Sequence, residues 1–152
     1  HRAEDVTVIT QDALISAFSS ILDALTLALV GIASVSLAVA GVGIMNVMLV
    51  SVTERRAEIG LLKALGALDR QVLAAFLAEA VLLAITGGVA GLAIGAGAVR
   101  VFVGIYPSFP ASPPAWAVAA SLGLSFAVGV GFGVWPARRA TLLDPVAALA
   151  RR

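Results

Sequence analysis

The sequence contains no cysteine, and its one histidine is His1. These absences exclude a disulfide framework, a thiolate metal site and a cysteine nucleophile. They also leave no internal imidazole that could act as the base for a serine nucleophile. Charged residues make up only 12% of the chain, about half the share found in soluble domains. Ten Lys/Arg against nine Asp/Glu give a net charge of +1, which provides no basic surface for nucleic acid.

Apolar residues are abundant instead, at 61% of the 152 residues. A soluble domain of this size buries too small a share of its surface to hide so many apolar side chains. The composition therefore predicts an all-α integral membrane protein, because helices satisfy their own backbone hydrogen bonds in lipid.

Three charge-free runs locate the membrane spans: Ala24–Thr53, Ala80–Val99 and Ala115–Trp135. A span needs roughly 20 helical residues, so the first run is long enough to project beyond one membrane face. We predict a long transmembrane or stalk helix over 12–53, with Asp12 as its cap, and further transmembrane helices over 71–105 and 115–137. Four prolines make 106–114 a loop between them. Residues 6–10 are largely β-branched and favour a short strand.

The basic residues orient these spans. Most of them lie in the 54–70 loop or in the tail over 138–152, and the opposite side carries only Arg2 and Arg100. The positive-inside rule places the loop and the tail in the cytoplasm and the N-terminus outside. No signal segment delivers that N-terminus, so we expect an earlier transmembrane helix upstream, with 1–11 ending an extracytoplasmic domain. In the tail, Asp144 and Pro145 are typical of the start of a short helix.

The cytoplasmic loop over 54–70 has the pattern of a short amphipathic helix. Apolar residues at helical spacing predict one apolar face, made of Leu61, Leu65, Leu68, Val72 and Phe76. Gly66 is a candidate stop signal. Two interpretations remain open. The helix either anchors the loop at the membrane surface or docks against a cytoplasmic partner, with Ile59, Gly60 and Ala64 allowing close approach.

Several ordered motifs resemble the MacB/FtsX-type ABC transporter permease family. They cover most of the chain and consist of Val42–Ala67, Phe76–Leu83, Gly87–Gly91, Trp135–Ala140 and Leu143–Leu149. The resemblance implies that the three spans correspond to the last three of four transmembrane helices. It also implies that the short cytoplasmic helix is a coupling helix that sits on an ATP-binding subunit.

The resemblance implies function and partners as well. Members transmit ATP-driven closure of nucleotide-binding domains to extracytoplasmic domains, and MacB-like members use this motion in efflux. The chain lacks a Walker motif, so ATP and Mg²⁺ are expected on the nucleotide-binding partner and no catalytic, cofactor or metal residue is assigned here. Further expected partners are membrane lipid, a second permease copy, a periplasmic adaptor and an outer-membrane channel. The expected location is the bacterial inner membrane.

The sequence thus yields a candidate coupling surface: Glu54, Arg55, Arg56, Glu58, Ile59, Gly60, Lys63, Ala64 and Gly66. An alternative function is an FtsX-like scaffold that regulates an extracytoplasmic partner such as a cell-wall hydrolase. Glu79 lies near a membrane boundary and has either a structural or a coupling role. The GxxxG pairs serve either packing within the chain or a dimer face, and they are Gly87/Gly91, Gly91/Gly95 and Gly129/Gly133.

Overall fold

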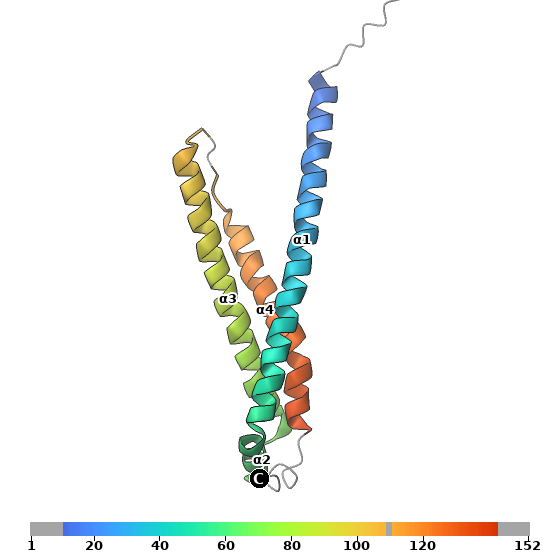
Figure 1. Ribbon diagram of the computed structural model, residues 1–152, viewed down its shortest axis with the longest axis vertical. Helices are drawn as coiled ribbons and strands as arrows, with labels where there is room; N and C mark the ends of the chain where they lie inside the picture. The colour runs from blue at the N-terminus through green and yellow to red at the C-terminus, as the bar shows by residue number, and fades with distance from the viewer. Residues whose placement is uncertain (1–10, 109–110, 143–152) are drawn as a thin grey trace, which may run out of the picture. The chain divides into compact units, whose positions relative to one another are not determined.

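The computed structural model describes residues 11–108 and 111–142, and these residues form four helices (Figure 1). The helices are α1 (Gln11–Glu54), α2 (Arg56–Ala64), α3 (Asp69–Ile105) and α4 (Ala115–Thr141). Three of them, α1, α3 and α4, are long and apolar enough to cross a membrane. No strand occurs in the described ranges. The predicted all-α membrane fold is therefore confirmed.

The helix bounds differ from the predicted ranges mainly around the short helix. The predicted 54–70 segment contains α2, a turn and the first residues of α3, while α4 continues past 137 to Thr141. Helix α1 begins at Gln11, so Asp12 lies inside the first turn instead of before it. The strand predicted over 6–10 and the short helix predicted at Asp144 lie outside the described residues.

The chain divides into two compact units at Ala38 and Val39. The described part of the first unit is the N-terminal stretch of α1, where large apolar side chains such as Leu14, Phe18 and Leu29 are exposed. Most of its hydroxyl groups bond within the helix: Ser20, for example, donates to the carbonyl of Ser16 at 2.9 Å. Hydroxyls satisfied in this way are tolerated on a helix surface that faces lipid.

In the second unit, α3 and α4 lie side by side and pack through small residues (Figure 1). A Cβ atom built on Gly129 would lie 2.9 Å from the Cα atom of Val81, and one built on Gly133 would lie 2.5 Å from the Cβ atom of Ala80. Only glycine permits this approach of two backbones. The Gly129/Gly133 pair therefore serves packing within the chain. Cβ atoms on Gly87, Gly91 and Gly95 would meet nothing within 4 Å, so those pairs do not pack within the described structure.

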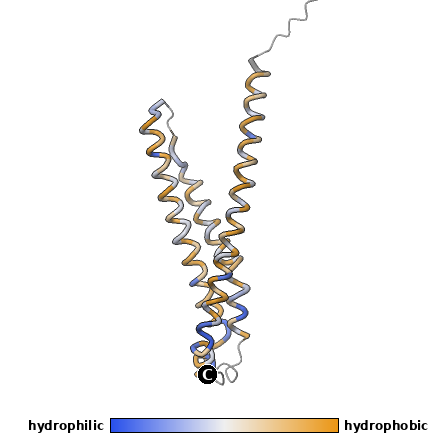
Figure 2. The backbone as a smooth tube through the Cα atoms, in the orientation of Figure 1, coloured by the Kyte–Doolittle hydropathy of each residue, from blue (hydrophilic) through white to orange (hydrophobic). Residues whose placement is uncertain are grey.

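The buried core of the second unit gathers around α2. It joins side chains from all four helices: Met48, Val52, Ile59, Val72, Phe76, Ala80, Ala137 and Ala140. Polar residues concentrate at this same end of the unit, as the hydropathy colouring shows (Figure 2). The core therefore fixes the position of the short polar helix relative to the ends of α3 and α4.

A glycine turn ends α2 and starts the return into α3. The amide of Gly66 donates to the carbonyl of Lys63, and the amide of Ala67 donates to the carbonyl of Leu62, both at 3.0 Å. This is a Schellman arrangement, which needs a residue with positive φ after the helix, and Gly66 has φ 98°. The predicted stop at Gly66 is confirmed.

The same turn shows that the predicted continuous apolar face is wrong. Leu61 and Leu65 are exposed, whereas Val72 and Phe76 are buried on a different helix. The chain reverses at Gly66, so residues spaced at three and four on either side of it do not share one face.

Candidate functional site

The nine residues predicted as a coupling surface lie together at the α2 end of the second unit, but they face different ways. Glu54 ends α1, Arg55 occupies the joint before α2, and Gly66 lies in the turn after it. The other six are on α2 itself: Arg56, Glu58, Ile59, Gly60, Lys63 and Ala64.

The joint at Arg55 redirects the chain without breaking its hydrogen bonding. Its amide donates to the carbonyl of Ser51, and its carbonyl accepts from the amide of Ile59, both at 3.0 Å. The backbone of Arg55 has φ −93° and ψ 17°, outside the ordinary helical region. α2 is therefore a separate helix connected to α1 by one residue.

The inner side of α2 belongs to the core. Ile59 is 2% exposed and Gly60 is buried. These two residues were predicted to allow close approach of a partner, and that role stays a prediction. Within this chain, Ile59 packs in a core with side chains of α1, α3 and α4. Ile59 therefore helps to hold the helix in place.

Lys63 ties the end of α2 to both neighbouring helices. Its ammonium group lies 3.0 Å from a carboxylate oxygen of Asp69 at the start of α3. It also donates a hydrogen bond of 2.7 Å to the carbonyl of Thr141 at the end of α4. The side chain is only 16% exposed, so solvent screens these contacts incompletely. A cation at the carboxyl end of α4 also complements its dipole.

Arg55 links α2 to α3 on the outer side. Its guanidinium lies 3.8 Å from Glu58 and 3.5 Å from Glu79 of α3. The three side chains are about half exposed or more, so each pair contributes under about 1 kcal/mol. The carboxylate of Glu79 is therefore paired with Arg55 at the joint between α1 and α2.

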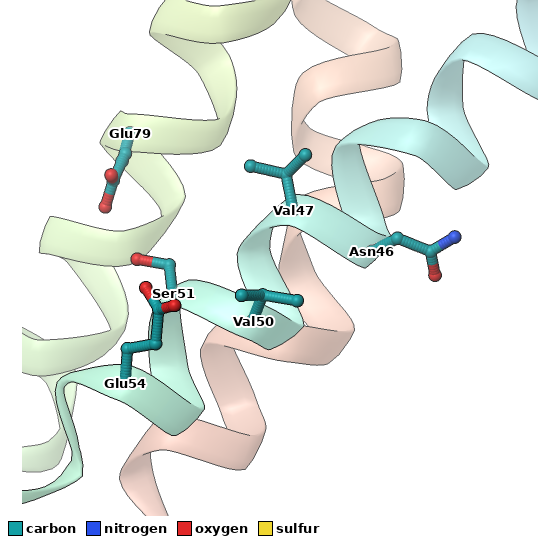
Figure 3. Close-up of a pocket in the computed structure, with 6 residues that line it drawn as sticks. All are labelled: Asn46, Val47, Val50, Ser51, Glu54 and Glu79. Atoms are coloured by element: carbon teal, nitrogen blue, oxygen red, sulfur yellow. The ribbon is translucent and has the colours of Figure 1, made fainter.

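A cavity of about 430 Å³ opens beside this joint, between α1 and α3 (Figure 3). Glu54, Ser51 and Glu79 turn their oxygen atoms toward the same opening, and Val47 and Val50 supply apolar walls. Among the described residues no three His, Cys, Asp or Glu side chains come close enough to hold a metal ion.

The outer side of α2 carries exposed apolar side chains, of which Leu61 and Leu65 were predicted to belong to one apolar face and Leu62 was not predicted. Leu61 and Leu62 are about half exposed, and Leu65 is 77% exposed. Leu61 and Leu62 lie on the same short helix as the charged residues Arg56 and Glu58, and Leu65 directly follows that helix. The signal that could have identified this exposed face is Gly66, because a helix ending there cannot continue the apolar face into α3.

Comparison with known proteins identifies the family of this chain. The family described as FtsX-like permease C-terminal matches residues 30–145. The macrolide export ATP-binding/permease protein MacB of Rhodopseudomonas palustris strain HaA2 is 41% identical over 151 residues, and that of Marinobacter nauticus is 43% identical over 150 residues. Each match covers 99% of this chain but 23% of the relative. The chain thus spans about a quarter of the curated relatives it matches, and it belongs to the FtsX-like permease C-terminal family.

Proposed function

We propose that this chain is the permease part of a MacB-like ABC transporter, which couples ATP hydrolysis on a nucleotide-binding domain to extracytoplasmic movement and efflux by mechanotransmission. The observation that carries the proposal is the two-sided character of α2. Its inner side is buried among the other helices, and its outer side presents leucines beside charged residues.

This arrangement suits the transfer of a displacement. Ile59 packs in a core shared with α1, α3 and α4, and Lys63 is bonded to the ends of α3 and α4. Because packed interiors deform little, a partner that moves α2 moves the ends of the long helices with it. In this proposal the docking surface consists of the exposed residues Arg56, Glu58, Leu61, Leu62, Ala64 and Leu65, supported from within by Ile59, Gly60 and Lys63.

The proposed orientation of the chain in the membrane rests on the basic residues at the α2 end of the second unit. Six basic residues lie on α2, at its joint and at the adjoining ends of α3 and α4: Arg55, Arg56, Lys63, Arg70, Arg138 and Arg139. The positive-inside rule then places this end in the cytoplasm and the N-terminus outside, in a bacterial inner membrane. ATP and Mg²⁺ would be held by the nucleotide-binding domain. The relatives are named ATP-binding/permease proteins, which supports such a partnership.

Two further parts of the proposal concern α1. Its N-terminal stretch exposes large apolar side chains along its length, which suits contact with lipid and with a second permease copy. Its length suits a stalk that reaches an extracytoplasmic domain. A periplasmic adaptor and an outer-membrane channel would then receive the exported molecule.

The test replaces Leu61 and Leu65 with serine in the full-length protein and measures ATPase activity and efflux together. We expect ATP hydrolysis to lose its dependence on the transported substrate, because the altered surface no longer holds the nucleotide-binding domain. Leu124→Ser on α4 is the matched control, since Leu61 and Leu124 are equally exposed at 52%. Normal coupling in a correctly assembled Leu61→Ser, Leu65→Ser protein would contradict the proposal.

A further inference from the structure

A second cavity opens where the start of α3 meets the end of α4. Its volume is about 390 Å³, and its lining consists of Asp69, Arg70, Leu73, Arg138, Thr141 and Leu142. Two arginines from different helices therefore border one space, together with two leucines. Of these residues, Asp69 and Thr141 contact Lys63 of α2, and Leu73 packs against the core that contains Ile59.

The charges around this cavity leave a positive excess. The carboxylate of Asp69 is paired with Lys63 at 3.0 Å, so these two charges offset each other. Arg139 lies over the ring of Trp135, 4.2 Å from its centroid. Arg70 and Arg138 have no ion pair within residues 11–108 and 111–142. The lining itself is mainly apolar, and two arginines that border it without an ion pair in the described part of the chain favour an anion with an apolar portion.

The position of the cavity restricts which anion it would take. Arg70 is the second residue of α3 and Arg138 lies in the last turn of α4, so both mark the boundary of helices that can span a membrane. Leu73 and Leu142 add apolar surface to the lining. A ligand that carries a phosphate and an acyl chain meets both features, and basic pockets between transmembrane helices bind anionic lipid headgroups.

We propose that this cavity binds an anionic phospholipid, with Arg70 and Arg138 holding its phosphate and Leu73 and Leu142 contacting the first part of its acyl chain. Guanidinium groups suit this role because they donate paired hydrogen bonds to phosphate oxygens. The bound lipid would link the start of α3 to the end of α4 through its negative phosphate. Lys63 links the same two helix ends through a positive charge. The site does not depend on the proposed coupling to an ATPase.

The experiment measures lipid retained by the full-length protein in detergent, by native mass spectrometry with phosphatidylglycerol and phosphatidylcholine as probes. We expect wild-type protein to retain phosphatidylglycerol in preference to phosphatidylcholine. Arg70→Gln and Arg138→Gln should each weaken phosphatidylglycerol binding about fivefold. Replacing both with lysine should preserve more binding than replacing both with glutamine, because lysine keeps the charge.

Arg100→Gln is the matched control, since Arg100 is an exposed arginine elsewhere on α3. An equal loss in Arg100→Gln would overturn the proposal by showing a general charge effect. Unchanged binding in the folded Arg70→Gln, Arg138→Gln protein would overturn it directly. Displacement of the lipid by inorganic phosphate at equal concentration would show a free-phosphate site instead. Because the readout is lipid binding, failure here leaves the ATPase test of α2 unaffected.

Discussion

Replacing Gly129 with alanine tests whether α3 and α4 depend on close backbone contact. The new Cβ atom would lie 2.9 Å from both the Cα atom of Val81 and the Cβ atom of Ala84. Ordinary contacts between carbon atoms lie at about 3.5–4.0 Å, so the helices would have to separate by roughly 0.6–1 Å. The obstructing Val81 atom belongs to the backbone and cannot rotate away.

Overpacking of this kind costs about 1–3 kcal/mol. We therefore expect Gly129→Ala to lower the free energy of unfolding by that amount. The assay is reversible unfolding of the chain in mixed micelles by sodium dodecyl sulfate, followed by circular dichroism and by the fluorescence of Trp116 and Trp135, both on α4.

Gly131→Ala provides the control on the same helix. A Cβ atom at Gly131 would meet nothing within 4 Å, so it adds no clash, and the exchange of glycine for alanine favours the helix. We expect this variant to be as stable as the wild type or more stable. Equal unfolding curves for Gly129→Ala and Gly131→Ala would refute the reasoning that α3 and α4 meet through glycine.

Three further predictions concern α2, and unfolding in the same micelles measures each. Gly66→Ala should lower the free energy of unfolding by about 1–2 kcal/mol, because φ 98° strains any residue with a Cβ atom; Gly66→Asn should cost less, and equal costs would contradict this. Lys63→Met should lower the free energy of unfolding by about 1.5–3 kcal/mol, because it removes charged contacts to the start of α3 and the end of α4. Unchanged stability would show that those contacts do not hold the helix. Ile59→Ala should lower the free energy of unfolding by about 2–5 kcal/mol, because it opens a cavity in the core. Leu65→Ala should leave that free energy almost unchanged, because Leu65 is exposed. Similar losses in the two variants would place Ile59 outside the core.

Local patterns were sufficient to predict the fold class and most helix bounds. Long runs without charge require a membrane environment, because no soluble domain of this size could bury them. The break before Ala115 follows from prolines that cannot continue a helix, and the observed helix begins at that residue. The stop at Gly66 follows from the left-handed conformation that glycine adopts without strain. Each of these features depends on neighbours in the chain.

The three-dimensional structure decided which side of the short helix is available. Ile59 and Leu65 are equally apolar and lie on the same segment, yet one is buried and the other is exposed. Their difference depends on the direction from which Met48, Phe76 and Ala140 approach, and those residues come from three separate helices. No periodicity within a nine-residue helix specifies that direction.

Long-range electrostatics were decided in the same way. The sequence by itself predicted that Glu79 and Arg138 lie near a membrane boundary, because each flanks a run without charge, and that Lys63 lies in the loop between two spans. Only the tertiary structure could show that Lys63 bonds to Thr141, which is 78 residues further along the chain. It also pairs Glu79 with Arg55 and places Arg138 at a cavity shared with Arg70. The physical reason is that hydropathy depends on each residue's own side chain, whereas a partner depends on how the helix ends are brought together by core packing.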